Sequence, residues 1–504
     1  MLPERHGNFR AVRVVAAATA MLLSVAGCSP GDAEKRCSAE LPATAQPGFA
    51  LSMSNGECIG WTVEQEYAFS PDPHPEVRDL VGAIVRKNVE IARSGLPYVR
   101  VAVMMPLAGD TAAAVTPSGI IDALRGVYTA QMRANDPDVH TLGTTRLGVQ
   151  VVLVNDGRAA DQWQGPVAQL ANMANGDHPL VAVTGLGASV DATQLAATEL
   201  SRSGMPAVGA VVTGTKLTAP TLFHVAPSNQ QSVAALRTWV DLRRPASGYL
   251  MRDGTSDPFL DSLNDALTAD FGAQFQLASH TSEFTGSRDP RNATPNLFLQ
   301  AAREIRCVEK SDVVFFSGRS RDLPDLVHAL AGVTNCRDEP VTVAAVAIGP
   351  DQLDPDGPLA KEMAAANVGV VVASATNNRG WGEGSAAPAG YRDFHDYYRE
   401  TLGFPEDALV DGYAIMHHDA VLTAVWAVRQ LFEESEGDVG SVRPQNVKNR
   451  IASLHGMWSV PAASGQLSFG DVTSTGGRPH GKPVPLIEVT VPAGATPPPV
   501  YETP

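Results

Sequence analysis

A glycine-rich turn at residues 185–190 is the first place where residue type and spacing suggest chemistry. It reads Gly-Leu-Gly-Ala-Ser-Val, follows an apolar run and precedes a helical pattern. A dinucleotide-binding turn has this position but needs a third glycine, and Asp191 stands where a pyrophosphate would approach. Two interpretations remain for Ser189. Its hydroxyl caps the following helix, or it joins the free N–H groups of the helix in binding a carboxylate.

No arrangement of residues typical of a catalytic or metal site is present in the sequence. Residues 476–483, Gly-Gly-Arg-Pro-His-Gly-Lys-Pro, differ from a phosphate-binding loop because proline follows the lysine. The motifs Gly-x-Ser-x-Gly and His-Glu-x-x-His are absent. His417 and His418 are neighbours on an expected helix, so their side chains point about 100° apart, which favours packing over a shared metal. We therefore expect no enzymatic activity, no cofactor and no metal.

The N-terminal segment is typical of a bacterial export signal. Three arginines precede an apolar run over residues 14–25, which is too short to span a bilayer comfortably. The run ends in Val-Ala-Gly-Cys, which resembles a lipobox in which Cys28 is lipidated after removal of residues 1–27; the alternative is a plain cleavable signal. Lipid on Cys28 would hold the protein at the extracytoplasmic face of the cell membrane, with residues 28–57 as a tether.

Charge and cysteine content narrow the expected environment. The 504-residue chain has 38 Lys and Arg against 54 Asp and Glu, a formal net charge of −16, which argues against a nucleic-acid partner. With Cys28 assigned to lipid, four of the five cysteines remain, and export places them in an oxidising compartment. Three connectivities are possible. We expect Cys37–Cys58 and Cys307–Cys336, because each pair brackets one local segment.

The hydrophobic pattern predicts the scaffold that must position these residues, an α/β fold with two doubly wound lobes. From residue 98 onward, short runs of β-branched residues alternate with amphipathic helices, as in parallel sheets covered on both faces. The first series has strands at 99–105, 149–155, 180–184, 207–211 and 222–225 and helices at 117–134, 162–175 and 192–202. The second has strands at 249–252, 275–278, 313–316, 341–348 and 369–374 and helices at 229–242, 258–271, 296–305 and 323–331. Helices at 391–402 and 410–432 and strands at 466–469 and 485–491 follow.

Several different short motifs follow one another between residues 98 and 490. They occupy residues 101–109, 152–156, 183–189, 204–208 with Thr213, 312–318 and 349–351. Their order and spacing resemble those of type I periplasmic solute-binding proteins, in particular the leucine/isoleucine/valine-binding group of ABC transporters. The resemblance implies two Rossmann-like lobes joined by a hinge of three crossover strands, near Ala226, Ser374 and residues 456–464.

The same resemblance divides the chain into lobes. Residues 98–226 and 375–458 form the N-terminal lobe, and residues 227–374 and 459–491 form the C-terminal lobe. Residues 58–97, with a helix at 75–94, are an extension that either packs on a lobe as an extra helix or docks a partner. Residues 492–504, which are rich in proline, are expected to be a disordered tail.

The resemblance also implies a ligand site between the lobes. A free amino acid held there would have its carboxylate at Ser189. Its ammonium would meet the main-chain carbonyl of Val212, the hydroxyl of Thr213 and the acidic side chain of Asp351. Each residue also has a structural interpretation: Ser189 caps a helix, Thr213 orders a turn and Asp351 is a loop carboxylate.

Two departures from the group bear on the ligand. Arg319 stands where the group often has a tyrosine, and Asp-Gly-Thr-Ser at residues 253–256 replaces a loop that contains a second tyrosine. Without the two tyrosine rings, and with a guanidinium in their place, the site is poorly suited to a branched aliphatic ligand. Our hypothesis is a smaller, more polar or acidic ligand, or an amide.

The function expected from the resemblance is non-covalent capture of an amino acid or a related small polar molecule for an ABC-type importer, with a membrane permease as partner. A lipid-anchored sensor of the same fold is the alternative, and the sequence does not separate the two. An extracellular enzyme is a third possibility, which the lack of a visible nucleophile, base or metal set disfavours.

Overall fold

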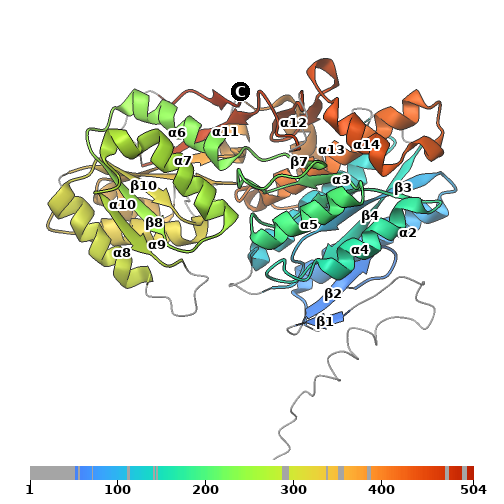
Figure 1. Cartoon of the computed structure of the whole chain (residues 1–504), viewed down its shortest axis with the longest axis horizontal. Helices are drawn as coiled ribbons and strands as arrows, with labels where there is room; N and C mark the ends of the chain where they lie inside the picture. Colours follow the sequence, from blue (N-terminus) through green and yellow to red (C-terminus); the bar gives the residue numbers. More distant parts are fainter. Residues whose placement is uncertain are drawn as a thin grey trace, which may run out of the picture.

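Two α/β lobes lie side by side and make up most of the chain (Figure 1). The structure, a computed structural model, describes residues 52–54, 57–67, 69–70, 72–109, 114–139, 142, 146–286, 294–336, 339–349, 357–382, 387–470, 476–490 and 497–504. Each lobe is built on one sheet, of seven strands in the first lobe and six in the second. The predicted α/β class with two doubly wound lobes is therefore confirmed.

The sheet of the first lobe has a parallel core with an antiparallel edge. Its strands follow the order β1 (Ser52–Ser54), β2 (Glu57–Thr62), β4 (Gly148–Asn155), β3 (Tyr98–Met104), β5 (Leu180–Gly185), β6 (Ala207–Gly209) and β7 (Leu222–His224). The strands β3 to β7 run parallel, whereas β2 pairs antiparallel with β4 and with β1. Because most strands are buried on both faces, their sequences are almost continuously apolar, as the sequence pattern predicted.

Helices cover both faces of this sheet, and side-chain alternation decides which face each strand residue serves. Val101 and Val103 of β3 pack into one core with α2 (Pro75–Arg93), α3 (Pro117–Ala134), α13 (Tyr413–Glu434) and α14 (Pro444–Ala452). Ala102 and Met104 point to the other face, where α4 (Gln164–Asn172) and α5 (Asp191–Arg202) pack. The period of two along a strand thus produces two separate cores from one sheet.

The second lobe repeats the plan. Its sheet has the order β16 (Leu486–Val489), β12 (Val368–Ser374), β11 (Val341–Ala347), β10 (Val313–Ser317), β8 (Gly248–Asp253) and β9 (Thr281–Phe284), and only β16 is antiparallel. One face is covered by α8 (Thr294–Arg303), α9 (Leu323–Ala331) and α10 (Pro358–Ala365), and the other by α6 (Asn229–Arg243) and α7 (Pro258–Phe275). Two short helices, α11 (Asn378–Gly382) and α12 (Ala389–Asp396), pack against the start of α13.

The second strand of this lobe lies further along the chain than predicted. The sequence pattern placed it at residues 275–278, but α7 continues to Phe275 and the strand is β9. Phe271 and Phe275 are four residues apart, so a helix puts both rings on one buried face. Gln276, with φ of 51°, then ends the helix in the left-handed conformation.

The predicted extension over residues 58–97 is an integral part of the first lobe. Strand β2 continues the sheet beside β4, and α2 packs against the same face as α3. Asn88 of α2, fully buried, donates hydrogen bonds to the carbonyls of Val63 and Val151 and accepts one from the N–H of Val151. Of the two alternatives left open by the sequence, the structure therefore shows packing on a lobe.

The chain passes between the two sheets three times, after β7, after β12 and before β16. The first two crossings agree with the predicted hinge positions near Ala226 and Ser374. The third does not, because β13 (Val460–Ala462) and β14 (Gly465–Leu467) pack into the core of the first lobe instead of crossing at residues 456–464. Gly477 still pairs with Phe223 of β7, so the third crossing follows it.

A buried charged network fixes this third crossing to the first lobe. The carboxylate of Asp419 on α13 accepts hydrogen bonds from the N–H groups of Ala463 (2.9 Å) and Ser464 (2.8 Å). It also accepts one from Nδ1 of His418 at 2.8 Å. The ammonium of Lys482, in the crossing, donates to the Ser464 carbonyl at 3.1 Å, and all these polar side chains are fully buried or nearly so.

Residues 497–504 are part of the fold, contrary to the disordered tail predicted for residues 492–504, of which residues 492–496 lie outside the described residues. Strand β17 (Tyr501–Glu502) pairs antiparallel with β15 (Pro483–Val484), which lies in the third crossing. Thr503 is buried and exchanges main-chain and side-chain hydrogen bonds with Lys482. The proline content suggested fraying, but the pairing partner is the crossing itself. In Figure 1 the C-terminus lies between the two lobes.

One of the two predicted disulfides lies fully within the described residues. Cys307, which follows α8, is bonded to Cys336, which follows α9, so the bridge ties two neighbouring helices of the second lobe. Cys58 is buried and disulfide-bonded. Cys37, its predicted partner, and Cys28, the predicted lipidation site, lie outside the described residues. Within the described part of the chain, no helix is long and apolar enough to cross a membrane.

The contact between α3 and α13 gives a test of this packing. A Cβ atom on Gly126 would lie 2.0 Å from the carbonyl oxygen of Ala414, a main-chain atom that has no room to move. We expect Gly126→Ala to lower the free energy of unfolding by about 3 kcal/mol. Gly165→Ala is the matched control, because no atom lies within 4 Å of its Cβ position on α4. Urea denaturation of both variants tests this, and equal stability of the two would contradict the close approach.

Candidate functional site

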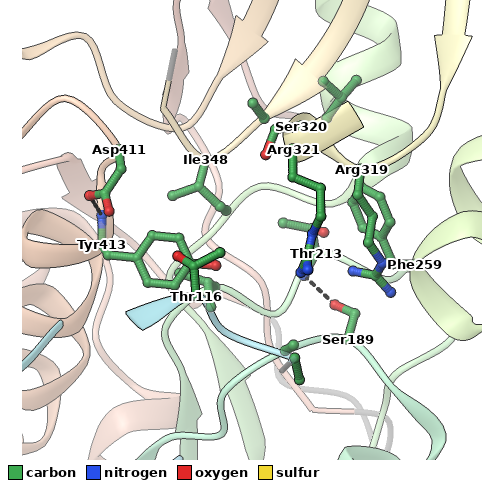
Figure 2. A pocket seen from close by; sticks show the side chains of 15 residues that line it. Thr116, Ser189, Thr213, Phe259, Arg319, Ser320, Arg321, Ile348, Asp411 and Tyr413 are labelled. Atoms are coloured by element: carbon green, nitrogen blue, oxygen red, sulfur yellow. Dashed lines mark hydrogen bonds between the residues drawn. The ribbon is translucent and has the colours of Figure 1, made fainter. Parts of the chain in front are cut away.

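A polar cavity lies between the two lobes, where the carboxyl ends of the parallel strands of both sheets meet. It encloses about 110 Å³. A single water needs about 10–15 Å³ by this measure, so the cavity has room for roughly 7 to 11 water-sized groups. This position, outside the strand ends, is where open α/β sheets bind ligands. The residues that line it come from both lobes and include Thr116, Ser189, Thr213, Phe259, Arg319, Ser320, Arg321, Asp411 and Tyr413 (Figure 2).

Ser189 lines the cavity and does not cap a helix. The N-cap of α5 is Val190, and no side-chain hydrogen bond caps that helix. The hydroxyl oxygen of Ser189 instead accepts hydrogen bonds from the N–H groups of Thr213 (3.0 Å) and Gly214 (3.1 Å). Both acceptor positions of the oxygen are thus occupied. Its hydrogen has no acceptor among the described residues, so Ser189 offers an oriented donor at the cavity wall.

The turn after β6 carries two further predicted site residues, of which one reaches the cavity. Thr213 lines it and is 5% exposed. Val212 is fully buried in the core below, and its carbonyl faces His224 Nδ1 at 3.1 Å and Arg478 Nη1 at 3.4 Å. The structure therefore brings Thr213 to Ser189 but does not bring the Val212 carbonyl into the cavity.

Arg478 forms hydrogen bonds with the main chain of this turn. Its guanidinium donates to the carbonyl of Gly214 at 2.8 Å and lies 3.4 Å from the carbonyl of Ala226 in the first crossing. Burial lowers the pKa of Arg478 to about 10, so the side chain stays protonated at neutral pH. The segment that begins the third crossing therefore positions both the Thr213 turn and the first crossing.

Arg319 enters the cavity from the second lobe, as the resemblance implied. It follows β10, forms an ion pair with Asp257 and lies over the ring of Phe259, with its guanidinium carbon 5.1 Å from the ring centroid. Asp257 also caps α7 by accepting the N–H groups of Phe259 (3.0 Å) and Leu260 (2.9 Å). These contacts hold Arg319 at one end of the cavity (Figure 2).

Several cavity residues were not predicted from the sequence. Arg321 comes from the same loop as Arg319 and reaches toward Thr213 and Ser189 (Figure 2). Asp411 accepts the N–H of Tyr413 at 2.8 Å just before α13 begins. The repeat of arginine at two-residue spacing was a usable signal. The start of α13 gave no such signal, because the predicted helix began at residue 410 and so included Asp411, whereas α13 begins at Tyr413.

The remaining predicted ligand residue, Asp351, lies outside the described residues, which resume at residue 357 after ending at residue 349. Of the five residues predicted to bind the ligand, the structure thus gathers Ser189, Thr213 and Arg319 in one cavity. It separates Val212 from that cavity, and it leaves the role of Asp351 as a prediction.

The two histidines of α13 have structural positions next to the cavity. His418 lies between Arg133, at 2.8 Å from its Nε2, and Asp419. His417 stacks on Tyr413 and its Nδ1 lies 2.9 Å from the Tyr413 carbonyl, while no described residue hydrogen-bonds its buried Nε2. Burial lowers the pKa of His417 to about 4, so this side chain is neutral at pH 7. Among the described residues, no group of three His, Cys, Asp or Glu side chains is arranged to hold a metal ion.

Two lobes whose five parallel strands have the same order, three crossings and a cavity between them define the type I periplasmic-binding fold. No protein-family profile and no curated protein matches the chain. The likeness is therefore one of structure, and it confirms the predicted resemblance at the level of the fold.

Solved structures of substrate-binding proteins match most of the chain. The branched-chain amino acid transporter substrate-binding protein LivJ of Streptococcus pneumoniae, in complex with isoleucine, is 15% identical; the match covers 80% of this chain and 99% of LivJ with a TM-score of 0.55. The leucine-binding protein LivK of Thermotoga maritima is 14% identical, with 81% and 98% covered and a TM-score of 0.54. A solute-binding protein of R. palustris in complex with 4-hydroxybenzoate is 12% identical, with 80% and 96% covered and a TM-score of 0.56.

Acidification tests the burial of the histidines beside the cavity. Between pH 6.5 and 4 the unfolded chain protonates His417 while the folded chain does not, so the stability present above pH 6.5 is lost as the pH falls. The loss reaches about 3 kcal/mol at pH 4, and His418, whose pKa burial also lowers, adds to it. We expect His417→Phe to flatten the dependence of the unfolding free energy on pH, and exposed His455→Phe to leave it unchanged. The same slope in all three proteins would contradict this assignment.

Proposed function

We propose that the chain is an extracytoplasmic solute-binding protein that captures an amino acid or a related small polar molecule between its lobes and presents it to the permease of an ABC-type importer. The fold supports this proposal, since the matched structures carry names of transport substrate-binding proteins. The capture is non-covalent: the solute enters an open cleft, the lobes close by bending at the crossings, and the solute is buried.

The observation that carries the proposal is the hydroxyl of Ser189 in the inter-lobe cavity. Because the N–H groups of Thr213 and Gly214 occupy its oxygen, the hydroxyl hydrogen is directed to whatever fills the cavity. A buried donor without an acceptor costs about 1–3 kcal/mol. A solute oxygen at this position would accept the hydrogen bond of Ser189.

The dimensions of the cavity agree with a solute of this class. Room for roughly 7 to 11 water-sized groups corresponds to the number of non-hydrogen atoms in an amino acid or a small aromatic acid. The matched proteins have such ligands in their names, isoleucine in one and 4-hydroxybenzoate in another. The apolar part of the wall, which includes Val211, Val346 and Ile348, would contact the hydrocarbon part of such a solute.

Substitution of Ser189 tests the site. Ser189→Ala removes the oriented donor and leaves the N–H groups of Thr213 and Gly214 without their acceptor, so affinity for the bound solute should fall at least about tenfold. Titration calorimetry with a panel of amino acids and small organic acids measures this. Ser203→Ala at the other, exposed end of α5 is the matched control and should leave affinity unchanged. Equal affinities of the two variants would contradict the role of Ser189.

We further propose that lipid on Cys28 anchors the protein to the membrane after residues 1–27 are removed. The basic start, the short apolar run and the Val-Ala-Gly-Cys sequence support this. Cells grown with radiolabelled palmitate should label the protein, Cys28→Ser should abolish the label, and Ser29→Ala should keep it. Label retained in Cys28→Ser, or absent from the wild-type protein, would contradict the anchor.

A further inference from the structure

Two arginines of one loop form a cationic wall of the inter-lobe cavity. Arg319 and Arg321 follow β10 and flank Ser320, and both guanidinium groups point into the space opposite Ser189 and Thr213 (Figure 2). Burial lowers the pKa of Arg321, and the positive charge of Arg319 lowers it further. A negative charge placed beside Arg321 in the cavity would favour its charged form.

The carboxylates that interact with these two arginines, Asp257 and Asp322, do not line the cavity. Among the described lining residues the only carboxylate is that of Asp411, which lies at the far end and accepts the N–H of Tyr413. Asp257 does pair with Arg319, but it also caps α7 and does not line the cavity. Asp322 and Tyr413 are the groups that raise the pKa of Arg321, and of these two only Tyr413 lines the cavity.

The opposite wall, on the first lobe, also consists of hydrogen-bond donors. The hydroxyl hydrogen of Ser189 is directed into the cavity because its oxygen already accepts two N–H groups. The hydroxyl of Thr213 lies beside it. A group held between these hydroxyls and Arg321 meets donors from both lobes, and a carboxylate is the group that accepts several charge-assisted hydrogen bonds at once. The planar fork of a guanidinium matches its two oxygens.

We propose that the solute is a small organic acid of net negative charge, and that Ser189 and Thr213 on one lobe and Arg321 on the other bind its carboxylate jointly, with Arg319 as the second cation. This inference rests on the proposed capture function and names the chemical class of the solute. Because the carboxylate is the bridge between the lobes, its negative charge also favours the closed arrangement over the open one.

The class includes dicarboxylates, acidic amino acids and aromatic carboxylates, and Asp411 distinguishes the amino acids from the others. The carboxylate of Asp411 is the group at the far end of the cavity that would accept an ammonium. Asp411→Asn should therefore weaken binding of an acidic amino acid and leave binding of a dicarboxylate or a benzoate unchanged.

Matched pairs of acids and amides test the proposal on the wild-type full chain. The probes are succinate and succinamide, L-glutamate and L-glutamine, and benzoate and benzamide, with L-leucine as a neutral amino acid, all measured by titration calorimetry. We expect at least one acid to bind and its amide to bind at least about 100-fold more weakly, since a site of charged donors rejects an uncharged isostere. Leucine or an amide that binds as tightly as every acid would overturn the inference.

Variants of the loop provide an independent measurement. Arg321→Gln leaves a shorter but still polar side chain and removes the charge, and it should weaken binding of the acid by about 30-fold or more. Arg252→Gln, at an exposed arginine of β8 in the same lobe, is the matched control and should bind normally. A folded Arg321→Gln variant with wild-type affinity would also overturn the inference.

The two proposals fail in different ways. If no acid, amide or amino acid of the panel binds and none raises the melting temperature, the capture function itself is contradicted, and the inference falls with it. If a neutral solute binds tightly and Arg321→Gln has no effect on it, capture stands and only the proposed charge of the solute is wrong.

Discussion

A single buried carboxylate, that of Asp419, constrains the region where the chain passes from one lobe to the other. Burial alone would raise its pKa, but the hydrogen bond and charge of His418, the charge of Lys482 and the hydrogen bond of Ser464 lower it. The carboxylate therefore stays ionised without access to water, and its partners must stay in place, because an uncompensated buried charge costs several kcal/mol. Helix α13, the turn between β13 and β14 and the third crossing are thereby fixed to one another.

This constraint extends to the inter-lobe cavity through the residues just before Lys482. Arg478 lies at the start of the same crossing and bonds to the carbonyl of Gly214, next to the Thr213 N–H that orients Ser189. The hydroxyl in the cavity is therefore positioned by a turn, the turn by an arginine, and the arginine by a segment tied to α13. Asp411, just before α13, and Tyr413, its first residue, line the same cavity. The arginines of the second lobe line it from the other lobe.

The sequence predicted those features that depend on local pattern. Apolar runs predicted most of the strands, and the family resemblance predicted Ser189, Thr213 and Arg319, which follow strands; in parallel sheets such turns share one edge. Features that depend on distant partners were not predictable. The Val212 carbonyl has the expected place in the chain, but His224 and Arg478, distant in sequence, turn it to the core.

The third crossing was misplaced because β13 and β14 look like any short strand pair until their burial against the first lobe is known. Asp411 was not predicted as a cavity residue because the expected helix began at residue 410, whereas Gly412, in the left-handed conformation, delays the start of α13 to Tyr413.

The pairing of β17 with β15 has a mechanical consequence. A crossing made of one extended chain bends with little resistance, whereas two hydrogen-bonded strands bend together as a ribbon and resist out-of-plane motion. The third connection, in which Thr503 and Lys482 are joined by hydrogen bonds, is such a ribbon, whereas the described residues of the other two are short single-chain segments. Relative rotation of the lobes is therefore expected to pivot about the ribbon as a stiff edge, with most of the torsional change taken up at the other two connections.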